Sequence, residues 1–178
     1  MKRMFLTFSI IALFSASALN ASFKVDVNTK PGFLEPMTVA VVVAQCQPAM
    51  NCTDLANRAS TIVATVMKNW RVVPKERVRQ ALFEQEKDSY SADDRESLAA
   101  ALEAEAFFEV AVQSAATGDG YGGLKGSEVN LIVRLVRPGG QLLLQGSGAG
   151  RPRNVVTSPE RVGANVIEKI LEAALKKR

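Results

Sequence analysis

A continuous run of apolar, mostly β-branched residues is the feature that most constrains the fold of this chain. It reads Thr-Val-Ala-Val-Val-Val-Ala over residues 38–44. A strand with one wet face alternates apolar and polar side chains, whereas a strand covered on both faces is apolar throughout. The run therefore predicts a strand that is buried on both faces.

Later segments alternate instead, which indicates strands with one wet face. They cover residues 107–114, 128–136 and 141–146, and the Arg-Pro-Gly-Gly sequence at 137–140 joins the last two as the turn of an antiparallel hairpin. A further short strand is expected at 71–73, between two helical patterns. A sheet that combines these strands with the buried one is a mixed sheet.

Four segments space their apolar residues by three and four, which is typical of amphipathic helices. We expect these helices over residues 53–70, from 74 onward, over 93–105 and from 159 to 175. The order of elements is then β-α-β-α-α-β-β-β-α. It predicts an α/β (α+β) fold of two layers, a mixed sheet of about five strands with helices mainly on one face.

The first 18 residues predict a signal peptide. Lys2 and Arg3 precede an apolar run that is too short to span a bilayer, and Ala-Ser-Ala at 16–18 forms a cleavage site, with Ala21 as an alternative. No cysteine follows at 19–22 to accept a lipid, and no second apolar run approaches the length of a membrane span. We therefore expect a periplasmic protein without a membrane span after cleavage.

The exported chain is expected to consist of two parts. Residues 19–37 contain Pro31, Gly32 and Pro36 and lack a clear pattern, so they are interpreted as an extended tether that packs on the domain. Residues 38–178 are interpreted as a single domain, because this length suffices for one hydrophobic core.

Cys46 and Cys52 are the two cysteines of the chain. In an oxidising compartment an even pair favours a disulfide, and Pro48 helps the intervening loop to turn. Free thiols are the first alternative and a redox-active or metal-binding pair is the second. A redox-active pair would need the C-x-x-C spacing, and a zinc site would need a histidine to complete it; the chain has neither.

Composition excludes several classes of function. The chain has no histidine, which removes histidine-based triads, histidine general bases and most metal sites. The glycines at 118, 120 and 123 match a dinucleotide fingerprint in letters, but they lie between two predicted strands rather than between a strand and a helix. The formal charge of +4 is halved when Lys2 and Arg3 leave with the signal peptide. We expect no cofactor, no metal and no nucleic-acid partner.

The order of the elements, with its local sequences, resembles a known family. The sequences are Val-Ala-Val-Val-Val at 39–43, Arg-Val-Val-Pro at 71–74, Ala-Phe-Phe-Glu-Val-Ala-Val at 106–112 and the hairpin at 128–143. The chain from 38 to 176 is similar to the bacterial envelope superfamily that includes the TolB amino-terminal domain, CsgG and LpoB. The resemblance implies a non-catalytic, protein-binding domain in a Gram-negative periplasm. This chain departs from CsgG and LpoB, which are lipoproteins, in lacking the lipid-accepting cysteine, so it resembles a non-lipidated member.

Two surfaces are candidates for function. The wet face of the predicted hairpin is a candidate protein-interaction face, because apolar side chains on an exposed sheet face suggest coverage by a partner or by the tether. Its predicted members are Ile132, Arg134, Gln141, Leu143 and Gln145. The start of the last helix is a candidate anion contact, formed by Arg151, Arg153 and Arg161.

These observations predict a periplasmic protein-interaction or assembly module of the cell envelope that is not an enzyme. Its expected partner is an envelope protein, with self-association as one form. A structural subunit of an envelope secretion or motility machine is an alternative. A secreted enzyme with a site that does not use histidine is another, and a cleft that gathers polar groups with perturbed pKa values would favour it.

Overall fold

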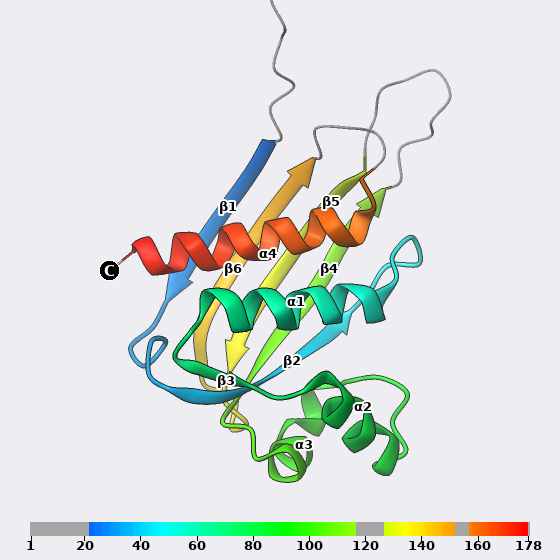
Figure 1. The fold of residues 1–178 in the computed structure, drawn as a ribbon, viewed down its shortest axis with the longest axis vertical. Helices are drawn as coiled ribbons and strands as arrows, with labels where there is room; N and C mark the ends of the chain where they lie inside the picture. The colour runs from blue at the N-terminus through cyan, green and yellow to red at the C-terminus, as the bar shows by residue number, and fades with distance from the viewer. Residues whose placement is uncertain (1–21, 117–126, 152–156, 178) are drawn as a thin grey trace, which may run out of the picture.

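A computed structural model describes residues 22–116, 127–151 and 157–177. A six-stranded mixed sheet with the order β1-β6-β5-β4-β2-β3 forms its centre (Figure 1). The strands are β1 (Ser22–Thr29), β2 (Met37–Gln45), β3 (Trp70–Val72), β4 (Ala106–Ala116), β5 (Glu128–Val136) and β6 (Leu142–Arg151). The helices are α1 (Cys52–Val66), α2 (Lys75–Glu84), α3 (Arg95–Leu102) and α4 (Pro159–Lys176), with a short 3-10 helix at Ala92–Asp94. The predicted α/β (α+β) class with a mixed sheet is confirmed, but the helices lie on both faces of the sheet rather than mainly on one.

The strand at the apolar run, β2, is buried on both faces as predicted. Val39 and Val41 join the main core, whereas Ala40 and Val42 belong to a second core cluster on the opposite face. The strand runs parallel to β3 and β4, and the pairs β4–β5, β5–β6 and β6–β1 are antiparallel. The sheet is therefore mixed.

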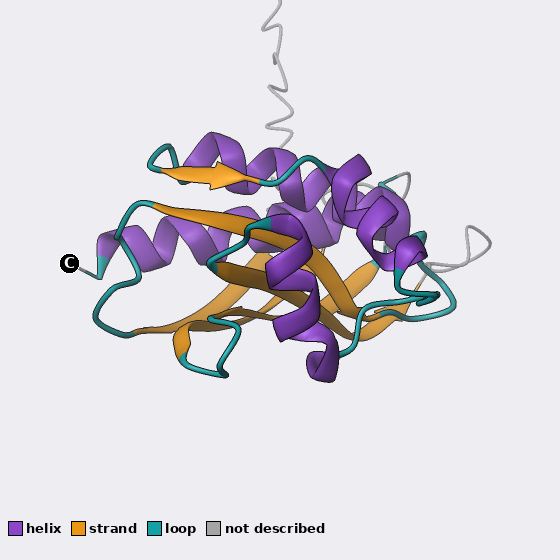
Figure 2. Cartoon of the chain, turned by 90° about the horizontal axis from the view of Figure 1, so that it is seen from below, coloured by secondary structure: helices purple, strands orange, loops and turns teal. Residues whose placement is uncertain are grey.

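The main core lies between the sheet and the helices α1 and α4, which lie along one side of it (Figure 2). The side chain of Asn51 caps α1 by accepting the N–H of Asp54 at 3.0 Å. Ser158 caps α4 and is followed by Pro159, whose missing N–H costs nothing in the first turn. The buried residues that these helices contribute include Leu55, Ala59 and Val63 from α1, and Val162, Val166, Ile167, Ile170, Leu171 and Ala174 from α4.

The second core cluster holds α2 and α3 against the other face of the sheet. Val78 of α2 and Leu98 of α3 pack with Ala40, Val42 and Phe107 there. The helices are thus divided between the two faces, but α2 and α3 cover only the part formed by β2 and β4. The helix α3 ends at Leu102 rather than at residue 105, because Glu103 adopts a left-handed backbone with φ of 51°.

The segment that the sequence analysis assigned to a tether contains a sixth strand. Residues 22–29 pair antiparallel with β6 over their whole length, from Ser22 opposite Arg151 to Thr29 opposite Leu144. Phe23, Val25 and Val27 alternate with polar residues and pack toward the main core. The apolar spacing of two is what a strand with one covered face requires.

The strand β6 is made of small residues where α4 crosses it. A Cβ atom placed on Gly146 would lie 2.3 Å from Cγ2 of Ile170, and one on Gly148 would lie 2.5 Å from Cγ1 of Val166. Real Cβ atoms do not approach so closely, so these glycines let α4 lie directly against the sheet.

Cys46 and Cys52 form a disulfide, as predicted, with Cα atoms 6.0 Å apart. The bond closes the loop between the end of β2 and the first residue of α1. It therefore fixes the start of α1 relative to the buried strand.

Candidate interaction surface

Part of the second face of the sheet is not covered by α2 and α3. We call it the open face. It is formed by the positions of β1, β5 and β6 that alternate with the core positions, together with the end of β4. Its members are Lys24, Asp26, Gln113, Asn130, Ile132, Arg134, Gln145, Ser147 and Ala149.

The open face contains a hollow of about 460 Å³. Ile132 lies opposite Ser147 across β5 and β6, and Ser147 in turn lies opposite Asp26 of β1. In this row the small side chain of Ser147 therefore lies between the longer side chains of Ile132 and Asp26. The hollow offers hydroxyl and amide groups, single charges of both signs, and aliphatic residues that include Ile132 and Ala149. This mixture of a small apolar centre and a polar surround is typical of a protein-binding surface.

Arg134 lies at the border between the open face and the part that α3 covers. It is exposed, and it lies between Glu109 of β4 and Gln145 of β6 in the register of the sheet. Within the described residues Arg134 forms no ion pair, because the carboxylate of Glu109 is bound by Arg95 instead. Its guanidinium is therefore available to a carboxylate of a partner.

The structure brings together three of the five residues predicted for the interaction face. Ile132 is half-buried, and Arg134 and Gln145 are exposed, all on the open face. Gln141 is exposed before the start of β6, where it lines a different hollow, described below.

The prediction for Leu143 is wrong, because its side chain is fully buried in the main core. In the pairing of β5 with β6, Leu135 lies opposite Leu144, but the next residue, Val136, lies opposite Leu142. The register therefore shifts at this point. Leu143 is the extra residue at this irregularity, so it departs from the simple alternation on which the prediction rested. Leu143 and Leu144 both enter the core.

The other hollow, of about 590 Å³, lies where the start of β2 meets the turn between β5 and β6. Arg137 Nη2 lies 3.2 Å from Glu35 Oε2, and Glu105 Oε2 accepts the N–H of Thr38 at 2.7 Å. These charged groups hold the loop before β2 to the rest of the sheet.

The predicted anion contact is not assembled in the described residues. Arg151 Nη2 lies 2.8 Å from Glu128 Oε2, so its charge is already paired. Arg161 is exposed, and its backbone N–H donates to the hydroxyl of Ser158. Arg153 lies outside the described residues. The prediction that the three arginines converge therefore has no support in the described geometry.

A carboxylate of the protein itself lies at the start of α4. Glu160 is buried, and its Oε1 accepts the N–H of Asn51, the cap of α1, at 2.7 Å. Burial opposes ionisation of Glu160, but the N–H groups of Asn51 and of its own backbone, together with the Ser158 hydroxyl, outweigh it and lower the pKa of this carboxyl. Glu160 thus joins the first turns of the two helices that cover the main core.

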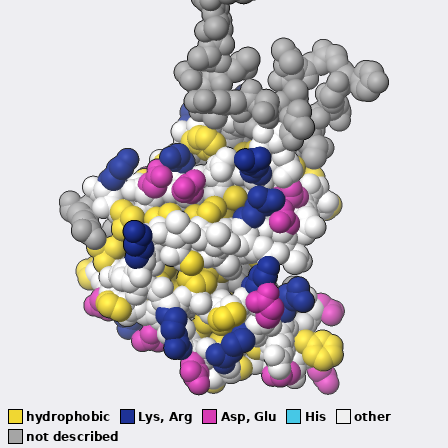
Figure 3. Space-filling model, viewed as in Figure 1, with side chains coloured by type: hydrophobic (Ala, Val, Ile, Leu, Met, Phe, Trp, Pro, Cys, Tyr) yellow, Lys and Arg dark blue, Asp and Glu magenta, His cyan; other side chains and the backbone are white. Residues whose placement is uncertain are grey.

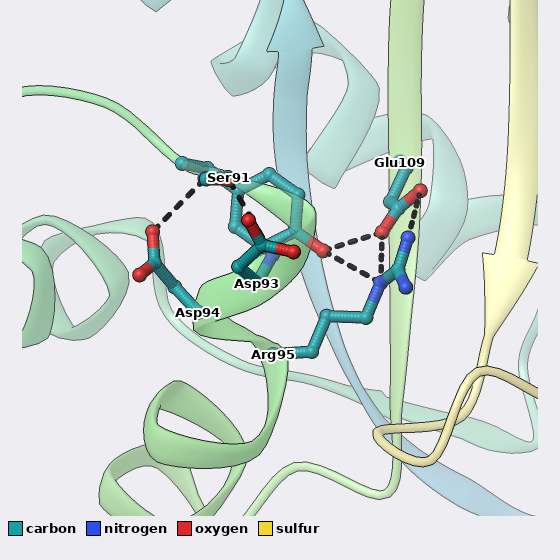
Figure 4. A network of polar contacts seen from close by, with 6 residues as sticks. Ser91, Asp93, Asp94, Arg95 and Glu109 are labelled. Atoms are coloured by element: carbon teal, nitrogen blue, oxygen red, sulfur yellow. Dashed lines mark hydrogen bonds and ion pairs between the residues drawn. The ribbon is translucent and has the colours of Figure 1, made fainter.

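A buried polar network closes the covered part of the second face (Figure 4). Arg95 Nε donates to Glu109 Oε1 at 2.6 Å, and Arg95 Nη2 donates to Glu109 Oε2 at 3.2 Å. The hydroxyl of Tyr90 donates to Glu109 Oε1 and accepts from Arg95 Nε. A two-point guanidinium–carboxylate pair of this kind fixes both partners in orientation.

Burial and the neighbouring Glu109 carboxylate raise the pKa of Tyr90 above its ordinary value, so its hydroxyl stays protonated. The hydrogen bonds of Arg95 to Glu109 raise the pKa of its guanidinium, although burial opposes this. Neither group is poised to exchange protons near neutral pH. The network fastens the start of α3 to β4, and this sets the limit of the open face.

This network was not predicted from the sequence. The signal that could have found it is an acidic residue surrounded by Phe107, Phe108 and Val110, because a buried carboxylate requires a partner. Glu109 is in fact buried with Arg95 as that partner.

Acidic and basic side chains are interspersed over the side of the molecule formed by α1 and α4 (Figure 3). Within residues 22–116, 127–151 and 157–177 there is no group of three or more cysteine, aspartate or glutamate side chains arranged to hold a metal ion. Nor is any helix of these ranges both long and apolar enough to cross a membrane. The predicted signal peptide and the glycines at 118, 120 and 123 lie outside these ranges.

No family model matches the sequence, and no curated protein matches it. Among solved structures, the chain is similar to the PelC dodecamer from Paraburkholderia phytofirmans, with a TM-score of 0.54 and 14% identity over 84% of this chain and 95% of that one. It is also similar to the LpoB C-terminal domain from Salmonella enterica, with a TM-score of 0.50 and 14% identity over 66% of this chain and 84% of that one. Both are bacterial envelope proteins. At these identities the likeness shows a similar fold alone.

Proposed function

We propose that this protein is a non-catalytic interaction or assembly module of the bacterial cell envelope, that it acts in the periplasm, and that it binds a protein partner through the open face. One observation carries the proposal. The sheet is covered by α1 and α4 on one side and by α2 and α3 over part of the other, and no described helix covers the remainder of that side around Ile132.

The chemistry of the open face supports a protein as the ligand. A half-buried isoleucine supplies a small apolar contact, and Asn130, Gln145 and Ser147 surround it with hydrogen-bonding groups. Protein interfaces combine an apolar centre with a polar rim in this way. Arg134, which forms no ion pair within the described residues, adds a guanidinium at the border, and arginine is a residue type that is enriched at interfaces.

The likeness to known structures gives independent support at the level of fold. PelC was solved as a dodecamer, so a related fold serves in an assembly. The LpoB domain has a similar fold and is also an envelope protein. An envelope location agrees with the signal peptide predicted from residues 1–18.

Site-specific photo-crosslinking in the native envelope tests the proposal. A photoreactive amino acid at Gln145, which is exposed on the open face, is expected to give a discrete adduct whose partner is identified by mass spectrometry. The same amino acid at Thr61, which is exposed on α1, is the matched control and is expected to give no such adduct. Equal adducts from both positions, or none from Gln145, would refute the proposed role of the open face.

A further inference from the structure

Within the described residues, no strand pairs with the outer edge of β1. β1 is the last strand of the sheet, with β6 on its inner side. The N–H of Lys30 donates to the carbonyl of Leu143 on that side at 2.8 Å. Because the backbone groups of successive strand residues point to alternate sides, those of Phe23, Val25 and Val27 point outward.

One contact confirms this direction. The ammonium of Lys177, which follows α4, donates to the carbonyl of Val27, and it lies 3.9 Å from the carboxylate of Asp26. No other hydrogen bond to the outward groups of Phe23, Val25 and Val27 is present in the described part of the chain. Apart from the Lys177 contact, these outward groups have no partner in the described residues, so a strand of matching sequence could add to this edge.

We propose that two copies of this chain pair edge to edge through β1, antiparallel and with Val25 opposite Val25 of the second copy. This interface is formed by the outer backbone edge of β1 and does not depend on the function proposed for the open face, although Lys24 and Asp26 belong to both surfaces. In this register the outward backbone groups of Phe23, Val25 and Val27 meet those of Val27, Val25 and Phe23 of the second copy. The sheet then continues across a two-fold axis.

The charged residues of β1 favour this register over the two adjacent registers. With Val25 at the axis, Lys24 of each copy lies opposite Asp26 of the other, so two ion pairs form on the open-face side of the sheet. A shift in one direction puts Lys24 opposite Lys24, and a shift in the other puts Asp26 opposite Asp26. Like charges directly opposite each other destabilise a strand pair.

The side chains on the helical side also match. Phe23 and Val25 are half-buried, whereas Val27 is fully buried. Pairing puts Phe23 beside Val27 of the second copy and Val25 beside Val25, which covers the exposed part of these apolar side chains.

Lys177 competes with the second copy in this arrangement. Its two contacts, the Val27 carbonyl and the Asp26 carboxylate, are the groups that the N–H of Phe23 and the ammonium of Lys24 from the second copy would bind. Lysine at a sheet edge weakens edge-to-edge pairing. We therefore expect weak association in the native chain and, because a competing hydrogen bond is removed, association about five-fold stronger after Lys177→Ala.

Sedimentation of the native chain and its variants, at concentrations up to about 1 mM, tests the register. Lys24→Glu or Asp26→Lys alone is expected to weaken dimerisation about five-fold or more, because each puts like charges opposite each other twice. The double variant Lys24→Glu/Asp26→Lys is expected to return to within about two-fold of the native chain. A Lys177→Ala chain that stays monomeric, or charge variants that dimerise like the native chain, would overturn the proposal.

A cysteine crosslink gives a second readout, because a disulfide traps even a weakly associated dimer. In the proposed register the two Val25 Cα atoms lie about 5.5 Å apart, so Val25→Cys is expected to form an intermolecular disulfide. Asn28→Cys on the same strand is the matched control, because the two Asn28 positions lie roughly 20 Å apart and cannot be bridged. Equal crosslinking of both variants would contradict the register.

Ile132→Lys, on the open face, is expected to leave the Val25→Cys crosslink unchanged. Failure of this proposal is therefore distinguishable from failure of the proposed function.

Discussion

Glu160 in the first turn of α4 accepts the N–H of Asn51, the cap of α1, at 2.7 Å. A single carboxylate thereby joins the N-terminal ends of the two helices that cover the main core. The positive end of each helix stabilises the ionised form.

Glu160→Gln is expected to lower the free energy of unfolding by about 1 kcal/mol at pH 7, because the charge-assisted hydrogen bonds are weakened. The pKa of Glu160 is lowered in the folded state, so its contribution is fully present above the pKa of the unfolded chain and is lost as the pH falls through the folded pKa. The difference between native and variant is therefore expected to be constant above about pH 5 and to vanish in stronger acid. Urea unfolding at several pH values measures it.

Glu168→Gln is the control for this experiment. Glu168 lies on the same helix and is half-buried, without a hydrogen bond to another helix in the described residues. We expect a change within about 0.5 kcal/mol. An equal, pH-dependent loss in both variants would contradict the assigned role of Glu160.

The Arg95–Glu109 pair is expected to behave as one unit. Arg95→Met or Glu109→Leu alone leaves a charged group inside the second core cluster and should cost about 2–4 kcal/mol in unfolding free energy. The double variant is expected to cost clearly less than the sum, because no unpaired charge remains. A double-mutant cycle by urea unfolding measures the coupling, and additive losses would show that the two side chains act independently.

Gly146→Ala tests the contact of α4 with β6. The added methyl group would lie 2.3 Å from Cγ2 of Ile170, a β-branched side chain that is fully buried and has little room to move. We expect a loss of about 1–3 kcal/mol, seen as a lower midpoint of thermal unfolding. Gly139→Ala is the control, since no atom lies within 4 Å of its added methyl group. Similar midpoints for the two variants would contradict the packing described.

The sequence predicts those parts of the fold whose signals are local. The apolar run at 38–44 identifies the buried strand, the spacing of apolar residues by three and four indicates the helices, and the pair Cys46 and Cys52 favours a disulfide. Each of these rests on residues that are near one another in the chain, where propensity and geometry act directly.

The remaining features depend on contacts between distant segments. β1 pairs with β6, which lies more than a hundred residues later, and the pairing of Asp26 with Ser147 leaves no local trace. The burial of Glu109 depends on where α3 packs, and the burial of Leu143 depends on a register shift in the hairpin. The extent of the open face follows from these tertiary details, which is why only part of it could be predicted.

The effect of Ile132→Lys on the adduct formed from Gln145 tests the central claim most directly. Both side chains lie on the open face, and Ile132 supplies its apolar contact. Ile62→Lys, a half-buried isoleucine of α1, is the matched control. We predict that Ile132→Lys abolishes the adduct while circular dichroism shows an unchanged fold, and that Ile62→Lys leaves the adduct intact. A folded Ile132→Lys variant that forms the adduct in full yield would contradict the account.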